Sequence, residues 1–237
     1  MSDRWRLLSD NVPVMKPIIV FDVNETLLDL TTLEPLFERC LGDRHAMRDW
    51  FAELILYSQT VTLAGHYMPL DELAVATLRM RAEVVGARPA TADEKALGEL
   101  IRSMPAHPDV VPALDRLRVG GFRLVTLTNS PPSESPTPLE RAGIAEYFEA
   151  HYSVHPVGQF KPAPACYRQV ASALGVPMRD LCLVACHGWD TIGAQAAGCQ
   201  AAFVKRAGNA EIRLADLPRP DFVADDLETL VATLVAA

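Results

Sequence analysis

The sequence predicts an α/β protein in which a helical cap domain is inserted into a doubly wound parallel sheet. Two observations predict this class. Short, continuous apolar runs alternate with helical patterns, which is typical of parallel strands covered on both faces. The alternation stops between Asp29 and about Met104, where helical patterns follow one another without a strand. We therefore expect a core domain in residues 15–29 and 105–237 and a cap domain in residues 30–104.

Each expected strand is a short run of mainly apolar residues. The five strands are expected at PIIVFDV (17–23), FRLVTLTN (122–129), HYSVH (151–155), LCLVAC (181–186) and QAAFV (200–204). Helices of the core are expected at residues 109–121, 138–148, 162–175 and 190–198, and helices of the cap at residues 33–42, 45–65, 69–86 and 91–104. In the longest of these, side chains recur at helical spacing at Leu54, Tyr57, Ser58 and Val61.

Composition excludes several classes of function. The chain of 237 residues carries a net charge of -8, whereas binding to a nucleic-acid backbone depends on clustered Lys and Arg. No apolar run approaches the roughly 20 residues that cross a bilayer, and the charged N-terminus does not resemble a secretion signal. The five cysteines show neither a CxxC nor a Cys/His zinc spacing, which favours reduced thiols. We expect a cytoplasmic protein with no nucleic-acid or membrane partner.

Polar side chains occur at or shortly after the ends of four of the five expected strands. In a doubly wound sheet, ligands bind beyond the carboxyl ends of the strands. Each such residue also has a purely structural explanation as a helix cap, a turn residue or a solvated loop charge. Their joint occurrence at four successive strand ends favours a shared site. The candidate residues are Asp22, Thr26, Thr128, Asn129, Lys161, His187 and Asp190.

Four motifs carry a resemblance to a known family. In order they are FDVNETLLD (21–29), LTNS (127–130), FKPAPACY (160–167) and HGWDTIGA (187–194), with the helical insert after the first. This set resembles the haloacid dehalogenase superfamily and, within it, the type II L-2-haloacid dehalogenases. The resemblance runs from about Lys16 to the C-terminus.

This resemblance implies a Rossmannoid core and a role for each matching residue. Asp22 would be the nucleophile that forms a covalent ester, with Thr26 supporting it. Lys161 would neutralise charge near Asp22, and Asp190 would position Lys161 and the hydrolytic water. The expected substrate-binding residues are Thr128, Asn129, Asn24, Phe51, Trp50, Tyr167 and Trp189.

Two absences indicate which bond is broken. Phosphatases of the superfamily carry a second Asp two residues after the nucleophile, because an alkoxide leaving group must be protonated. Here that residue is Asn24. The phosphatases also bind Mg²⁺ with a carboxylate in the fourth motif, where this chain has Cys186. The sequence therefore predicts no metal and no other cofactor, and a leaving group that departs as a stable anion, such as halide.

The chain departs from the type II dehalogenases at two places. Their cap carries an arginine directly after a tryptophan, and this arginine receives the halide, whereas Trp50 is followed here by Phe51. Arg48 lies two positions before Trp50, and we expect it on a different face of the helix. His187 stands where many of the dehalogenases have a neutral amide. We expect His187 to be the base for ester hydrolysis, with Asp190 as the alternative.

Together these features predict a metal-independent hydrolase that converts a short 2-haloalkanoic acid into the 2-hydroxy acid and halide. Its partner would be a small carboxylate substrate, and the resemblance implies a homodimer formed through the cap. Three alternatives stay open. The chain could displace another leaving group, such as a strained-ring amine, from a 2-substituted carboxylate. It could be a Mg²⁺-dependent phosphatase, or a domain that binds a metabolite without turnover.

Overall fold

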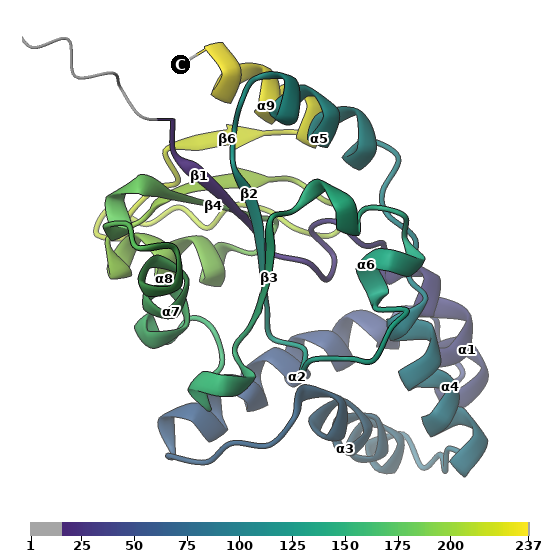
Figure 1. The fold of residues 1–237 in the computed structure, drawn as a ribbon. Helices are drawn as coiled ribbons and strands as arrows, with labels where there is room; N and C mark the ends of the chain where they lie inside the picture. Colours follow the sequence, from purple (N-terminus) through teal and green to yellow (C-terminus); the bar gives the residue numbers. More distant parts are fainter. Residues whose placement is uncertain (1–15, 237) are drawn as a thin grey trace, which may run out of the picture.

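A six-stranded sheet forms the centre of the molecule (Figure 1). The structure, a computed structural model, describes residues 16–236; residues 1–15, which hold most of the charged N-terminus, and residue 237 lie outside the described residues. The strands lie in the order β3-β2-β1-β4-β5-β6, and every pairing is parallel. They are β1 (Ile18–Phe21), β2 (Leu124–Thr128), β3 (Ala150–Ser153), β4 (Leu181–Ala185), β5 (Gln200–Val204) and β6 (Phe222–Ala224).

The strand order reverses next to β1, which lies between β2 and β4. Ile19 of β1 is in register with Leu124 on one side and with Cys182 on the other. All residues of β1 and β4 are buried, which explains why both strands are apolar along their whole length. Ligands of doubly wound sheets bind beyond the carboxyl ends of the strands at such a reversal. Asp22 directly follows β1 at this point.

Helices cover both faces of the sheet. In Figure 1, α5 and α9 pack together on one face, and α7 and α8 pack together on the other. The predicted α/β class with a doubly wound parallel sheet is thereby confirmed. The core helices are α5 (Val110–Val119), α6 (Pro138–Arg141), α7 (Pro164–Leu174), α8 (Gly188–Ala197) and α9 (Leu227–Ala236).

Four helices between β1 and α5 form a layer on the side towards which β1 runs (Figure 1). They are α1 (Glu34–Leu41), α2 (Ala46–Leu63), α3 (Leu70–Val84) and α4 (Thr91–Arg102). Trp50 of α2 connects three of them: its ring lies 5.0 Å from that of Phe37, and its indole N–H donates to the carbonyl of Ala74 at 2.9 Å. The division of the chain into domains at residues 30 and 104 stays a prediction.

Two segments differ from the expected elements. Residues 138–148 are predicted as one helix, but α6 ends at Arg141 because Gly143 adopts a left-handed φ of 71° soon after it. A 3₁₀ helix, Ala145–Tyr147, follows. The sequence pattern predicts neither β6 nor α9. The strand β6 has only three residues and lies at the edge of the sheet, so its pattern is too short to be recognised. Further 3₁₀ helices are Leu30–Leu33, His155–Val157 and Met178–Asp180.

Some expectations concern the whole chain. Within residues 16–236, no helix combines the length and the apolar character needed to cross a bilayer. The cysteines are free thiols, and all but Cys40 are buried. The cytoplasmic location and the homodimer stay predictions.

Candidate active site

Asp22 is anchored where β1 ends. Its backbone N–H donates to the carbonyl of Val184 in β4 at 3.0 Å, so the sheet fixes the position of the carboxylate. The residue is 5 % exposed. Thr26 donates a hydrogen bond to Oδ2 at 2.7 Å, and Lys161 donates from Nζ to Oδ1 at 2.7 Å. The residues expected as nucleophile, support and charge partner therefore lie together.

Lys161 is fully buried, and each of its three N–H groups has an acceptor. These are Asp22 Oδ1, Asp190 Oδ2 at 2.6 Å and the carbonyl of Leu127 at 3.1 Å. Burial alone would lower the pKa of Lys161, but the two carboxylates raise it above its ordinary value. For Asp22, burial alone would raise the pKa, but the positive charges of Lys161 and His187 hold the pKa of this carboxyl well below its usual range. Asp22 is therefore ionised, as a nucleophile must be.

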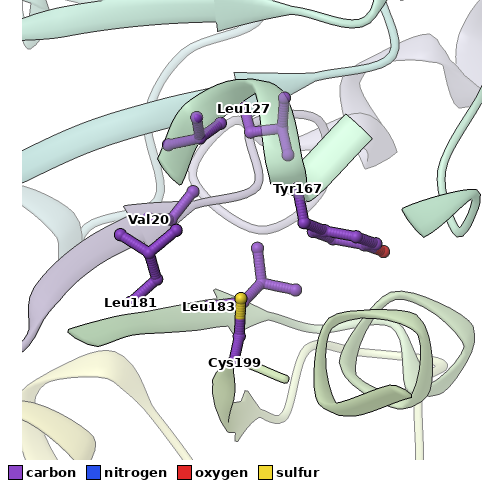
Figure 2. Close-up of a pocket in the computed structure, with 7 residues that line it drawn as sticks. Val20, Leu127, Tyr167, Leu181, Leu183 and Cys199 are labelled. Atoms are coloured by element: carbon purple, nitrogen blue, oxygen red, sulfur yellow. The ribbon is translucent and has the colours of Figure 1, made fainter. Parts of the chain in front are cut away.

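Asp190 holds Lys161 from the opposite side and is itself held by Tyr167. The Tyr167 hydroxyl donates to Asp190 Oδ1 at 2.6 Å, so both carboxylate oxygens have a hydrogen-bond donor. Burial raises the pKa of Asp190, and Lys161 opposes that shift. Figure 2 shows the ring of Tyr167 beside Leu127 and Leu183, where apolar side chains enclose a cavity of only about 10 Å³. Tyr167 thus supports Asp190 from within the core.

His187 lies beside the nucleophile as the residue that precedes α8. Its Nδ1 is 3.2 Å from Asp22 Oδ2, and its Nε2 is 2.8 Å from Oε2 of Glu25. Burial would lower the pKa of His187, but Cys186, Asp22 and Glu25 around the ring raise it well above its ordinary value. Both ring nitrogens face carboxylate oxygens, an arrangement that favours the imidazolium form, which can donate to both. The ring of Trp189 stacks on that of His187 at 5.0 Å.

Glu25 is a member of the site that the sequence patterns did not single out. Its side chain is almost completely buried, and its carboxylate pairs with His187 and with Arg48. Burial raises the pKa of Glu25, whereas hydrogen bonds from His187 and Arg48 lower it by more. Among the residues that the structure describes, Glu25 is the one non-glycine residue with a positive φ, 65°. No signal in the sequence shows this backbone conformation, because an acidic residue in a turn is ordinarily solvated.

Arg48 lies on a different face of α2 from Trp50, as expected, but that face turns toward the core. Arg48 reaches the core, where it pairs with Glu25 and donates to the carbonyl of Ala207 at 2.6 Å. The prediction compared Arg48 with Trp50, but Arg48 and Phe51 are three residues apart and share a helix face. The ring of Phe51 lies 5.6 Å from that of His187. Trp50 points into the layer of cap helices and is not brought to Asp22.

The remaining candidates connect the loops around the site. Asn129 accepts a hydrogen bond at its Oδ1 from the backbone N–H of Lys161, at 3.0 Å. Thr128 accepts from the backbone N–H of Ser130 at 3.1 Å. Asn24 donates from its side chain to the hydroxyl of Ser130 at 3.1 Å, which joins the loop after β1 to the loop after β2. These contacts position Lys161 against Asp22; substrate contacts of the three residues stay predictions.

Comparison with known proteins identifies the family. Residues 17–198 match the family described as haloacid dehalogenase-like hydrolase. The chain belongs to this family. The predicted superfamily and the prediction that the chain is a hydrolase are thereby confirmed.

Similar proteins support the same assignment. (S)-2-haloacid dehalogenase 1 of Pseudomonas sp. (strain CBS-3) is 28 % identical over 196 residues, which cover 81 % of this chain and 86 % of that protein. The solved L-2-haloacid dehalogenase from Xanthobacter autotrophicus has the same fold, with a TM-score of 0.84, 24 % identity and coverage of 93 % and 98 % of the two chains. A further solved L-2-haloacid dehalogenase is 29 % identical, with a TM-score of 0.84 and coverage of 94 % and 99 %.

The donor set of this haloacid dehalogenase-like hydrolase does not suit Mg²⁺. Within residues 16–236, Glu25, Cys186 and His187 form the one group of three or more His, Cys, Asp or Glu side chains whose potential ligand atoms all lie within 4.8 Å of one another. Mg²⁺ requires several oxygen ligands in an octahedron, whereas this group offers one thiol, one imidazole and one carboxylate. The carboxylate already pairs with Arg48 and His187, and Cys186 accepts from the side-chain amide of Asn209 at 3.4 Å.

Proposed function

We propose that this chain is a metal-independent dehalogenase that converts a short 2-haloalkanoic acid into the 2-hydroxy acid and halide through an ester on Asp22. The observation that carries the proposal is the ionised, buried Asp22 between Lys161 and Thr26, at the strand reversal. The residue two places on, Asn24, is an amide and cannot act as a general acid towards a leaving group. A leaving group that departs as a stable anion suits such a site. The names of the similar (S)-2-haloacid dehalogenases support this choice of substrate.

In the first step, a carboxylate oxygen of Asp22 attacks carbon 2 of the substrate. A carbon–oxygen bond forms while the carbon–halogen bond breaks, and the halide takes the bonding electrons. The main contribution of the protein to this step is to position the nucleophile. A backbone hydrogen bond to β4 and two side-chain donors fix the Asp22 carboxylate. Such pre-orientation can supply about 7–11 kcal/mol of the barrier.

In the second step, water attacks the carboxyl carbon of the Asp22 ester. Negative charge then develops on the ester carbonyl oxygen, where Lys161 or Thr26 is placed to donate a hydrogen bond. The water also needs a base. Both oxygens of Asp190 are engaged by Lys161 and Tyr167 at 2.6 Å, which favours His187 for this role.

Direct detection of the ester tests the proposal. The protein is mixed with (S)- and (R)-2-chloropropionate and with chloroacetate, free halide is measured, and the intact mass is recorded after rapid quenching. We expect halide release and a transient mass increase equal to the substrate without its halide, a 1-carboxyalkyl group, located on the peptide that contains Asp22. The Asp22→Asn variant should show neither. Absence of both signals from the wild-type protein with all three substrates would contradict the proposal.

A second candidate is the opening of a strained ring that carries a 2-carboxylate. Phe51, where the type II dehalogenases carry the halide-binding arginine, lies against His187, and Arg48 of the same helix is engaged by Glu25. This arrangement suits a leaving group that does not need a cation. Turnover of azetidine-2-carboxylate, followed by mass spectrometry of the product, together with no halide release from the haloacids, would favour this candidate.

A further inference from the structure

Four charged side chains form a continuous chain of contacts across the site. Arg48 of α2 pairs with Glu25, Glu25 accepts from Nε2 of His187 at 2.8 Å, and Nδ1 of His187 is 3.2 Å from Asp22. The chain therefore begins in the cap layer and ends at the nucleophile. Glu25, His187 and Asp22 are each at most 6 % exposed, so these contacts are shielded from bulk water.

The backbone of Glu25 indicates that its side chain is required at this place. A φ of 65° lies in the left-handed region, which glycine adopts freely and a residue with a side chain adopts at a cost. Such conformations persist where the surrounding structure holds them, and they cluster at functional sites. Here the contacts of the carboxylate are the evident compensation, since Glu25 binds His187 on one oxygen and Arg48 on the other.

We propose that His187 is the base that activates the hydrolytic water, and that Glu25 is the positioning residue that orients its ring and retains the proton on Nε2. This inference rests on the proposed function, since it assigns the second step of that reaction. The arrangement of a carboxylate, an imidazole and an acyl carbon follows the logic of hydrolases in which a carboxylate fixes the tautomer of a catalytic histidine. Here the acyl carbon is that of the Asp22 ester.

Formation of the ester changes the charge that His187 faces. The groups around the ring are Asp22 and Glu25 from the loop after β1, Cys186 at the end of β4, and Phe51 and Trp189, which are uncharged. In the free enzyme Asp22 is an anion and favours the proton on Nδ1. Once alkylated, Asp22 is neutral, and this attraction is lost while Glu25 still holds Nε2–H. The lone pair of Nδ1 then becomes available beside the ester.

The protons balance over the whole cycle. His187 loses its Nδ1 proton to solvent after the ester forms. Attack by water then transfers one water proton to Nδ1, the water oxygen bonds to the carboxyl carbon, and the ester carbon–oxygen bond breaks. The second water proton leaves with the 2-hydroxy acid, and Asp22 returns as a carboxylate carrying the water oxygen. One proton and one halide are released for each substrate and water consumed.

An open cavity of about 280 Å³ lies at the cap end of this chain of contacts. Glu25 and Arg48 line it, together with His107 and Arg206. It is large enough for several water molecules. The side chain of Arg48 is 30 % exposed, so water reaches the pair between Arg48 and Glu25 from this side, whereas His187 does not line the cavity.

The experiment measures the two steps separately in Glu25→Gln, His187→Asn and Arg48→Gln. Single-turnover mixing with 2-chloropropionate gives the rate of ester formation from halide release and the rate of ester hydrolysis from the decay of the mass adduct. In Glu25→Gln and His187→Asn we expect ester formation to stay within about threefold of wild type. We expect ester hydrolysis to fall about 10- to 100-fold and at least 100-fold respectively, so that the adduct accumulates.

The pH dependence of ester hydrolysis distinguishes a positioning role from a structural one. Glu25→Gln removes a negative charge beside His187, so the midpoint of the pH profile should move to lower pH. Arg48→Gln removes a positive charge beside Glu25, so the midpoint should move to higher pH. A purely structural loss would slow both steps and would not shift the midpoint in opposite directions. Glu149→Gln, which removes an exposed ion pair with Arg123 far from the site, is the matched control and should behave as wild type.

Several outcomes would overturn the inference. Hydrolysis of the ester at the wild-type rate in either Glu25→Gln or His187→Asn would exclude the assigned roles. One equivalent of zinc in the purified protein, lost on chelation together with ester hydrolysis, would show that Glu25, Cys186 and His187 hold a metal instead. If the wild-type protein forms no adduct and releases no halide, the proposed function itself fails, which is a different result.

Discussion

Lys161 donates a 2.6 Å hydrogen bond to Asp190, and both side chains are fully buried. The same ammonium also binds Asp22, so one buried cation serves two buried carboxylates. Breaking such a cluster on one side is costly because the charges that remain have neither water nor a partner.

Replacement of this lysine should destabilise the fold strongly at neutral pH. In Lys161→Met, Asp22 and Asp190 would be buried without their cation, and we expect the free energy of unfolding to fall by about 3–5 kcal/mol at pH 7. Urea unfolding followed by circular dichroism measures the difference. Adding Asp190→Asn removes one of the two unpaired charges, so the double variant should recover part of the loss. A double variant less stable than Lys161→Met would contradict this account.

The same variant should show a characteristic pH dependence. In the wild type the pKa of Asp22 is lowered on folding, so its stabilising contribution is present at neutral pH and is lost progressively as the pH falls below the unfolded-state value of about 4 towards the lower folded-state value. Without Lys161 the buried carboxylates should have raised pKa values, and acidification towards pH 4 should stabilise the variant. The stability gap between the two proteins should therefore narrow from pH 7 to pH 4. A constant gap would show that another interaction of Lys161 dominates.

Tyr167→Phe tests whether Tyr167 acts through Asp190. The hydroxyl donates to a buried carboxylate at 2.6 Å, and a hydrogen bond to a charged group contributes about 1.5–3 kcal/mol. We expect a loss of stability of that size and a lower kcat with KM changed less than about twofold, because the hydroxyl supports Asp190 rather than the substrate. Tyr147→Phe is the control, since its hydroxyl contacts Asp115 at the surface. A selective rise in KM for Tyr167→Phe would instead indicate direct substrate contact.

Metal removal should leave the reaction unchanged. The donor set around Cys186 lacks the oxygen ligands that Mg²⁺ requires, so dialysis against EDTA should alter halide release by less than about twofold. Hydrolysis of p-nitrophenyl phosphate should stay at the background rate with or without Mg²⁺. Phosphate release that depends on Mg²⁺ would restore the phosphatase interpretation.

Leaving-group dependence tests the role of Phe51. Asn24 cannot act as a general acid, so the halide must leave as an anion without being protonated. Ester formation from 2-halopropionates should therefore become faster as the halide becomes a weaker base, from chloride through bromide to iodide. Stopped-flow halide release at saturating substrate measures each rate. Phe51→Leu keeps an apolar side chain but removes the ring edge, whose partial positive charge can face an anion. We expect this variant to slow ester formation two- to tenfold, most for chloride; equal rates would exclude a role for the ring.

The positions of five of the six strands and the residues at their ends could be predicted from the sequence, because both depend on local patterns. Continuous apolar runs mark buried parallel strands, and the reversal of strand order then brings Asp22 and His187 to one edge of the sheet. The short edge strand β6 was not predicted, because three residues are too few to show a recognisable strand pattern.

The contacts of Glu25 could not be predicted, since they depend on a backbone angle and on the packing of a distant helix. Nothing in the turn NET shows that its acidic residue bends inward with a φ of 65°. Arg48 illustrates the same limit: helical spacing gives its angle relative to Phe51, but only the tertiary packing of α2 shows that it reaches Glu25. Which side chains of the site share protons could therefore be inferred only from the distances between them in the folded structure.

The pair between Arg48 and Glu25 joins the helical layer to the sheet. Arg48 moves with α2, whereas Glu25 is tied to the loop that also carries the nucleophile. Any outward displacement of the layer leaves Glu25 with His187 as its sole partner and changes the proton affinity of that ring. The position of the cap helix and the charge beside His187 are therefore linked through this one ion pair.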